Sequence, residues 1–317
     1  MLQVGQKMRH QDRGITVKEL CVHFGYSRAR YYQGQKENRR RMEQADTVLS
    51  LAHRERYLQP RLASDKVFRL IKPYLEEQGI KLGRDKLYAI FRDKGLLLET
   101  LKRQAPRTTN SGHGFKRYGN ILKDKDLTAP NQAWVCDITY LRVQQSWMYL
   151  CLIMDAYSRK IVGWHLHNTL EMVGCMKALD MAMKSLPKGF DHKQLIHHSD
   201  HGVQYCCHAY RKKLHRKGIQ ISMAAVGDCY ENAQAERLNG ILKQEYGLGG
   251  WISQKDHARK LTAQAVELYN TRRPHRALGL HTPQQVHAGV DAKVKMHWPK
   301  KNRSRPNGEQ KALEHAA

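Results

Sequence analysis

The sequence predicts an α/β protein with a mixed five-stranded sheet flanked by helices, preceded by an all-helical N-terminal region. Three observations favour this fold class. From Trp134 onward, β-branched and aromatic segments alternate with amphipathic ones, as strands and helices do. The first 98 residues show helical spacing and glycine turns instead. Asp137 also lies inside an apolar strand segment, where a carboxylate is costly unless it is paired or binds a metal ion.

The N-terminal region, residues 1–58, is basic and predicted to be helical. Thr16-Val-Lys-Glu19 is a capping-box pattern that opens a short helix. Gly25 then permits a tight turn, and Ser27 is placed to cap a second helix, which carries Arg28 and Arg30. This order favours a helix-turn-helix that binds DNA through these arginines, with an ordinary helical hairpin as the alternative.

Residues 59–98 are predicted to form a second helical subdomain, in which Ser64 caps one helix, Gly79 ends it and Gly83 precedes another. This subdomain is either a second helix-turn-helix or a compact helical unit. Residues 99–130 are rich in Lys, Arg, Gly and Pro and show little periodicity. We expect a basic linker there, either lying along DNA or solvated.

Residues 131–290 are predicted to form the α/β core, and residues 291–317 a basic, flexible tail. Strands are expected at 135–143, 148–156, 160–166, 194–197 and 219–223. A Met-rich helix capped by Thr169 and a helix over 203–217 lie between them, and a helix capped by Ser253 comes later. The predicted elements follow the order of the ribonuclease H-like fold, which is three strands, a helix, a strand, a helix and a strand.

The charge balance points to the class of partner. The chain has 55 Lys and Arg residues against 29 Asp and Glu residues, a net charge of +26 with neutral His. Such a surplus favours a polyanion, nucleic acid above all. The longest apolar stretch, 149–154, is far too short to span a bilayer, so no membrane partner is expected. No apolar secretory segment opens the chain, and seven scattered cysteines favour a reducing compartment.

Two further acidic residues stand at informative positions. Asp200 ends the fourth predicted strand just before a glycine, where open α/β sheets place functional groups, with a turn cap as the alternative. Glu236 lies in a helix with the core stripe Ala235, Leu238 and Leu242. Another face of that helix is polar and small, and it carries Asn232, Glu236, Gly240 and Lys243. This face suits close approach to a DNA phosphate, and Lys243 is placed to neutralise one.

Three carboxylates suit phosphodiester chemistry. Two Mg²⁺ ions about 3.5–4 Å apart clamp the attacking and leaving oxygens of an in-line displacement. Mg²⁺ prefers hard oxygen ligands and keeps some of its waters, so a few carboxylates suffice. We therefore expect Asp137, Asp200 and Glu236 to be both the catalytic residues and the metal ligands. Mg²⁺ is the expected cofactor, with Mn²⁺ as a substitute.

The spacing and the surrounding segments resemble a known family. Asp200 and Glu236 are separated by 35 residues, the D-D-35-E pattern of retroviral integrases and many bacterial transposases. The chain further resembles the second-frame (OrfB) transposases of the IS-three insertion-sequence family. The matching segments, in the family's order and spacing, are WVCDIT (134–139), DAYSRKIVGW (155–164), HSDHGVQY (198–205), NAQAERLNGILKQE (232–245) and YNTRRPHRAL (269–278). The resemblance is strong over 130–290 and weak over the helical N-terminal part.

The resemblance implies a ribonuclease H-like catalytic core that cleaves a donor DNA 3′ end and joins that 3′-hydroxyl to another phosphodiester. It implies insertion-sequence ends and target DNA as partners, a homo-oligomer on DNA, and the upstream-frame product as a fusion or partner. It also implies a place in the bacterial cytoplasm, at the nucleoid. Two alternatives stay open: a ribonuclease H-like nuclease without strand transfer, and a DNA-binding regulator with an inactive core.

Some residues depart from the family pattern or compete for a role. Glu231 stands where the family usually has Asp, and it becomes a rival for the third carboxylate. The 35-residue gap and Lys243 favour Glu236. Asp155, another acidic rival, is interpreted as structural. His201 follows the central Asp where the family often has Arg or Gln, and we expect it at the surface, with a contact to DNA or to a metal-bound water as the alternative.

Two other clusters contain residues that could bind a ligand. The segment around Pro274 is predicted to be a phosphate-contacting loop through Arg272, Arg273 and His275, with a plain basic turn as the alternative. Adjacent Cys206 and Cys207, followed by His208, lack the ligand spacing of a zinc site.

Overall fold

The computed structural model describes residues 16–99, 114–123, 125–224 and 232–292. The chain divides at residue 99 into two units, and each is described by itself. The first contains four helices among its described residues: α2 (Val17–His23), α3 (Arg28–Leu58), α4 (Ser64–Glu77) and α5 (Arg84–Asp93). No helix of the described part is long and apolar enough to cross a membrane. The predicted tail, 293–317, lies outside the described residues.

The predicted start of the helical region is confirmed in detail. The Glu19 amide donates to Thr16 Oγ1 at 3.3 Å, and the Thr16 amide donates to Glu19 Oε2 at 2.7 Å, which completes the capping box. Gly25 turns the chain with a φ of 65°, a conformation that glycine adopts without strain. Ser27 Oγ then accepts the Arg30 amide at 3.2 Å and caps α3, which continues for 31 residues.

The second half of α3 shares one apolar core with α4 and α5. Val48 and Ala52 of α3 belong to the same buried cluster as Ile71 of α4 and Phe91 of α5. The guanidinium of Arg56 lies 4.7 Å from the centre of the Phe91 ring. Residues before and after position 58, the predicted boundary, therefore pack into one core.

The second unit is built on a six-stranded sheet in the order β3-β2-β1-β4-β5, with a short β6 added to β1. The strands are β1 (Ala133–Val143), β2 (Ser146–Asp155), β3 (Ile161–His167), β4 (Ile196–Ser199), β5 (Gln220–Met223) and β6 (Trp251–Ile252). β1, β2 and β3 form an antiparallel meander, and β4 pairs in parallel with both β1 and β5. Apart from β6, this is the mixed sheet and strand order of the predicted ribonuclease H-like core.

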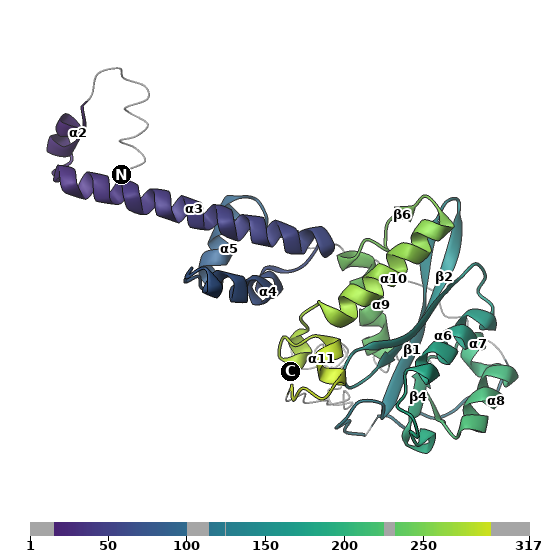
Figure 1. The fold of residues 1–317 in the computed structure, drawn as a ribbon. Coiled ribbons are helices and arrows are strands. Elements are labelled where there is room, and N and C mark those ends of the chain that lie inside the picture. Colours follow the sequence, from purple (N-terminus) through teal and green to yellow (C-terminus); the bar gives the residue numbers. More distant parts are fainter. Residues whose placement is uncertain (1–15, 100–113, 124, 225–231, 293–317) are drawn as a thin grey trace, which may run out of the picture. The chain divides into compact units, whose positions relative to one another are not determined.

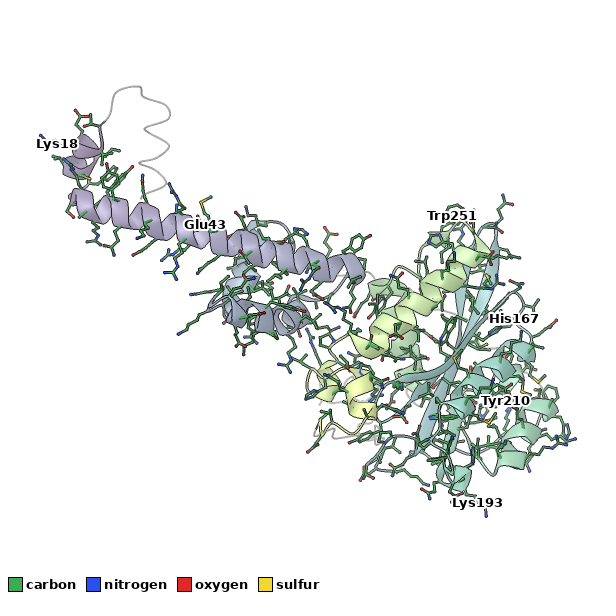
Figure 2. The ribbon with its side chains drawn as sticks, in the orientation of Figure 1. Lys18, Glu43, His167, Lys193, Tyr210 and Trp251 are labelled. Carbon is green, nitrogen blue, oxygen red and sulfur yellow. The ribbon has the colours of Figure 1, made fainter. Side chains whose placement is uncertain are left out.

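Helices cover both faces of the sheet (Figure 1). One face carries α6 (Met172–Lys184), α7 (Val203–Cys206) and α8 (His208–Lys217), and Tyr210, labelled in Figure 2, is fully buried there. The other carries α9 (Ala233–Glu245) and α10 (Lys255–Thr271), and α11 (Pro283–His287) follows near α10. Short 3₁₀ turns lie at His192–Gln194 and Arg276–Leu278.

Three predicted helix caps are wrong. α4 begins at Ser64 itself, after Ala63. α6 begins after Glu171, because the Thr169 amide and hydroxyl are both engaged with His167 Nδ1, at 3.2 and 3.1 Å. α10 begins after Gln254 rather than after Ser253.

Two other elements differ from the predictions. The helix predicted over 203–217 is interrupted at Cys207, which is extended (ψ of 150°) and divides α7 from α8. The strand β6 is only two residues long, too short for periodicity to reveal.

A buried ion pair joins the end of α9 to the segment after α10. The guanidinium of Arg273 is 4% exposed, and its Nε and Nη2 donate to the two carboxylate oxygens of Glu245, each at 2.6 Å. The same guanidinium lies 5.7 Å from the centre of the Tyr269 ring. This bidentate geometry holds the C-terminal end of α9 in place against α10.

Replacing Arg273 with Gln should destabilise the second unit by about 3 kcal/mol, because it leaves a largely buried Glu245 carboxylate without its cation. All five tryptophans lie at or beyond position 134, so tryptophan fluorescence during urea unfolding reports on this unit. Arg259→Gln is the control, since Arg259 pairs with an exposed Asp256 and should cost less than about 0.5 kcal/mol. Equal shifts for the two variants would contradict a structural role for the buried pair.

Candidate active site

Strand alternation places Asp137 on the α9 side of the sheet. Along β1, Trp134 and Cys136 belong to the core under α6 and α8, whereas Val135 and Leu141 belong to the core under α9 and α10. Successive side chains of a strand point to opposite faces. Asp137 therefore shares the face of Val135 and meets α9.

The parallel pairing of β1 with β4 brings Asp200 beside Asp137. Ala133 pairs with Ile196, and Val135 pairs with His198. Asp137 and Asp200 each stand two residues beyond this last pair, and Asp200 directly follows Ser199, where β4 ends. The Asp200 carboxylate accepts the Gly202 amide at 3.0 Å, which fixes the turn into α7.

Helix α9 supplies the polar partners of Asp137. Asn239 Nδ2 donates to Asp137 Oδ2 at 2.7 Å, while the Ile138 amide donates to Asp137 Oδ1 at 2.9 Å. Lys243 lies one turn further along the helix, half-buried and within electrostatic range of Asp137. Burial lowers the pKa of the Lys243 ammonium, and Asp137 opposes that shift.

The three predicted carboxylates influence one another electrostatically. Burial, and then the charge of Asp200, raise the pKa of Asp137 from 3.8 to about 8, with Glu236 acting in the same direction. Hydrogen bonds from Ile138 and Asn239 oppose the rise. Burial and then Asp200 also raise the pKa of Glu236, although this residue of the first turn of α9 is exposed overall. Three carboxyl groups thus lie within range of one another where burial and mutual repulsion disfavour their charged forms.

The oxygen donors at this edge suit a hard cation. The amide oxygens of Asn232 and Asn239 are buried and meet no hydrogen-bond donor among the described residues. They stand beside the carboxylates, as Asn239 contacts Asp137 and Asn232 Nδ2 donates to the Cys136 carbonyl at 3.3 Å. In the described part of the chain, no three His, Cys, Asp or Glu side chains are close enough to enclose a metal ion as they stand.

The structure brings together most residues of the predicted site and adds one. Asp137, Asp200, Glu236 and Lys243 gather at one edge, and Asn232 lies buried beside them. Asn239 was not predicted, although its place between Glu236 and Lys243 at helical spacing was a readable signal. The rival Glu231 lies outside the described residues.

The other acidic rival, Asp155, ends β2 and pairs with Trp134, three register positions from Asp137. Asp155 is fully buried, and its carboxylate accepts the Asn131 and Ser158 amides and the Ser158 hydroxyl, each at 2.7 Å. Its environment is that of a structural carboxylate, as we interpreted it. His201, which we expected at the surface, is only 7% exposed, so that expectation is wrong.

The predicted DNA-contacting arginines fall into two groups. Arg28 and Arg30 are exposed at the start of α3, and Arg30 lies 5.2 Å from the centre of the Tyr26 ring. Arg272 is half-buried at the end of α10. Arg273 and His275 are buried, at 4% and 6% exposure. Because Arg273 already binds Glu245, its placement favours a bracing role over a phosphate contact.

Family models and known proteins agree with this architecture. Two models, both described as an integrase core domain, match residues 128–229 and 217–283. The "Insertion element IS600 uncharacterized 31 kDa protein" of Shigella sonnei is 36% identical, covering 83% of this chain and 96% of that protein. The transposase InsF for insertion sequence IS3fB of Escherichia coli is 29% identical, covering 87% of this chain and 95% of that protein.

A further relative and a solved structure extend the comparison. The putative transposase for insertion sequence element IS986/IS6110 of Mycobacterium tuberculosis is 32% identical, covering 69% of this chain and 80% of that protein. The HTLV-2 integrase catalytic core domain, in complex with magnesium, is 18% identical with a TM-score of 0.40 and covers 50% of this chain and 97% of that chain. The sequence relatives, the integrase core models and the mixed sheet agree: this chain belongs to the IS3 family of insertion-sequence transposases.

Proposed function

We propose that this transposase cleaves the 3′ ends of its insertion sequence and joins them to target DNA by a Mg²⁺-dependent mechanism with Asp137, Asp200 and Glu236 as metal ligands. The observation that carries the proposal is the parallel pairing of β1 with β4, which ends at Val135 and His198, each two residues before one of the aspartates. The raised pKa values of Asp137 and Glu236 support it, because carboxylates crowded together favour binding of a cation or a proton.

The available donors fit Mg²⁺, which prefers oxygen ligands and keeps some of its waters. When bound, it would neutralise charge on the attacking and leaving oxygens of the phosphodiester. Ligation by all three carboxylates requires Glu236 to move closer to the two aspartates, which its exposed place in the first turn of α9 permits.

The chain's own residues have separate tasks in this proposal. Asn239 holds Asp137 in one orientation through its 2.7 Å hydrogen bond. Lys243, half-buried on the same helix, offers a positive charge to a phosphate at the metal site. Arg28 and Arg30 at the start of α3, together with Arg272, offer further phosphate contacts. We place the reaction at the nucleoid in the cytoplasm, on a homo-oligomer, with the upstream-frame product as fusion or partner.

Asp137→Asn and Glu236→Gln should each lower strand transfer at least about a thousandfold, a loss of about 4 kcal/mol of transition-state stabilisation. A strand-transfer assay with end-labelled DNA and Mg²⁺ measures it. Glu231→Gln is the matched comparison, and loss of activity only at Glu231 would move the third ligand there. Hydrolysis without joined products would support the nuclease alternative instead. Full DNA binding with no wild-type activity to lose would support the regulator alternative.

Asn239→Ala should lower strand transfer about 10–100-fold, because Asp137 loses the partner that orients it. A positioning role predicts that a higher Mg²⁺ concentration partly restores the rate. Gln244→Ala, an exposed change on the same helix, should leave the rate unchanged. An Asn239 variant with the wild-type rate at every Mg²⁺ concentration would contradict this role.

The metal-free chain should lose stability as pH rises from about 4 to about 8. A carboxyl whose pKa is raised on folding binds its proton more tightly in the folded state, and this advantage disappears as pH rises through the folded pKa of about 8. The free energy of unfolding is measured by tryptophan fluorescence in the presence of a chelator. Between about pH 4 and about pH 8, the value for Asp137→Asn minus the value for the wild type should therefore increase with pH. A difference between the two proteins that is constant with pH would show that Asp137 does not carry the raised pKa.

A further inference from the structure

The second unit has a groove of about 610 Å³ that the catalytic carboxylates do not line. We call it the basic groove. Helix α8 lines most of it, through His208, Arg211, Lys212, His215 and Arg216. Lys116 and Tyr118, from the segment before β1, complete it. The lining thus contains four Lys or Arg residues and two His residues, and no acidic side chain.

The fold itself fixes the groove. On α8, Tyr210 and Leu214 are buried in the core, so helical spacing turns the basic residues outward. The segment carrying Lys116 and Tyr118 is held against β5, where the Met223 amide donates to the Gly119 carbonyl at 3.3 Å. Tyr118 Oη and His215 Nε2 lie 2.9 Å apart, which ties this segment directly to α8.

Within the described part of the chain, the Lys and Arg residues of the groove form no ion pair with an acidic side chain, unlike Lys213. Lys213, on the same helix, forms an ion pair with Asp180 of α6 and does not line the groove. Arg211 Nε donates to the Cys206 carbonyl at 2.7 Å, which holds its guanidinium at the groove. Lys212 and Arg216 are exposed. Four cations held on two segments form a surface that attracts a polyanion.

One residue links the groove to the candidate site. Cys206 ends α7, directly before the break that precedes α8, and its carbonyl accepts a hydrogen bond from Arg211 of the groove. Burial and then Asp200 raise the pKa of its thiol to about 11, while Arg211 and Arg117 oppose the rise.

We propose that the basic groove binds the phosphate backbone of duplex DNA and is a DNA-holding surface separate from the catalytic carboxylates. The inference rests on the proposed function, because it assigns a surface where this enzyme binds its DNA outside the reaction centre. Backbone contacts position a duplex without reading its sequence. The groove should therefore act alike on insertion-sequence ends and on target DNA.

The test is duplex binding by the full chain, measured by fluorescence anisotropy over a salt series without divalent metal, so that catalysis does not enter. The triple variant Lys116→Gln, Lys212→Gln, Arg216→Gln should weaken binding and lower the slope of log K against log salt by about 2 to 3. The control Lys177→Gln, Lys184→Gln, Lys188→Gln removes the same charge from exposed positions elsewhere on this unit and should change the slope less. Equal effects of the two triple variants would overturn the proposal.

Two duplexes separate the sources of the phosphate: one of unrelated sequence, and one carrying the element's own end. The triple variant should lose affinity for both by a similar factor. A loss confined to the element end would overturn the backbone assignment, since it would indicate sequence reading. These outcomes differ from failure of the proposed function, which would appear as a lack of joined products while duplex binding persists.

A second measurement uses the unaltered protein and does not depend on the folding of a variant. Lysine acetylation, followed by mass spectrometry, should slow at Lys116 and Lys212 when the unrelated duplex is added, and remain unchanged at Lys177. Unchanged acetylation of Lys116 and Lys212 at a saturating duplex concentration would overturn the proposal.

Discussion

The parallel pairing of β1 with β4 is the constraint on which the site depends. It pairs Val135 with His198, so that Asp137 of β1 and Asp200, directly after β4, each follow this pair by two residues. Asp137 lies on the side that α9 covers, where Asn239 donates to it. A shift of one residue would turn Asp137 toward the core of Cys136 and His197, where neither α9 nor its polar side chains could reach it.

Helix α9 contributes both to the core and to the chemistry. Ala235, Leu238 and Leu242 pack into the apolar cluster under the sheet, and Asn239 and Lys243 extend toward Asp137. The position of the helix therefore sets the electrostatics of the site. Its far end is held by the buried pair of Glu245 with Arg273, so the segment after α10 contributes to the site by bracing α9.

The arrangement of charge divides the second unit into two regions. The carboxylates gather where β1 and β4 end, and burial together with their mutual repulsion raises the pKa of Asp137 to about 8. The basic groove lies along α8, with Lys116 added from the segment before β1. In the functions proposed above, the carboxylates serve the reaction and the basic groove holds the DNA backbone, so the two tasks fall to different elements of one fold.

The sequence alone determined the caps of α2 and α3, the strand segments and the acidic residues that stand at unusual positions in or directly after them. The capping box at Thr16, the succession of β1 to β5 along the chain and the apolar stripe of α9 follow from patterns of a few residues. Asp137 and Asp200 are predicted as site residues because a carboxylate in or at the end of an apolar strand is unusual wherever it occurs. Only the tertiary structure decided that Arg273 is buried, that Asn239 meets Asp137, and that Tyr118 joins His215 to close the basic groove. Each of these contacts joins segments distant in the chain, and no local pattern encodes which faces of such segments will meet.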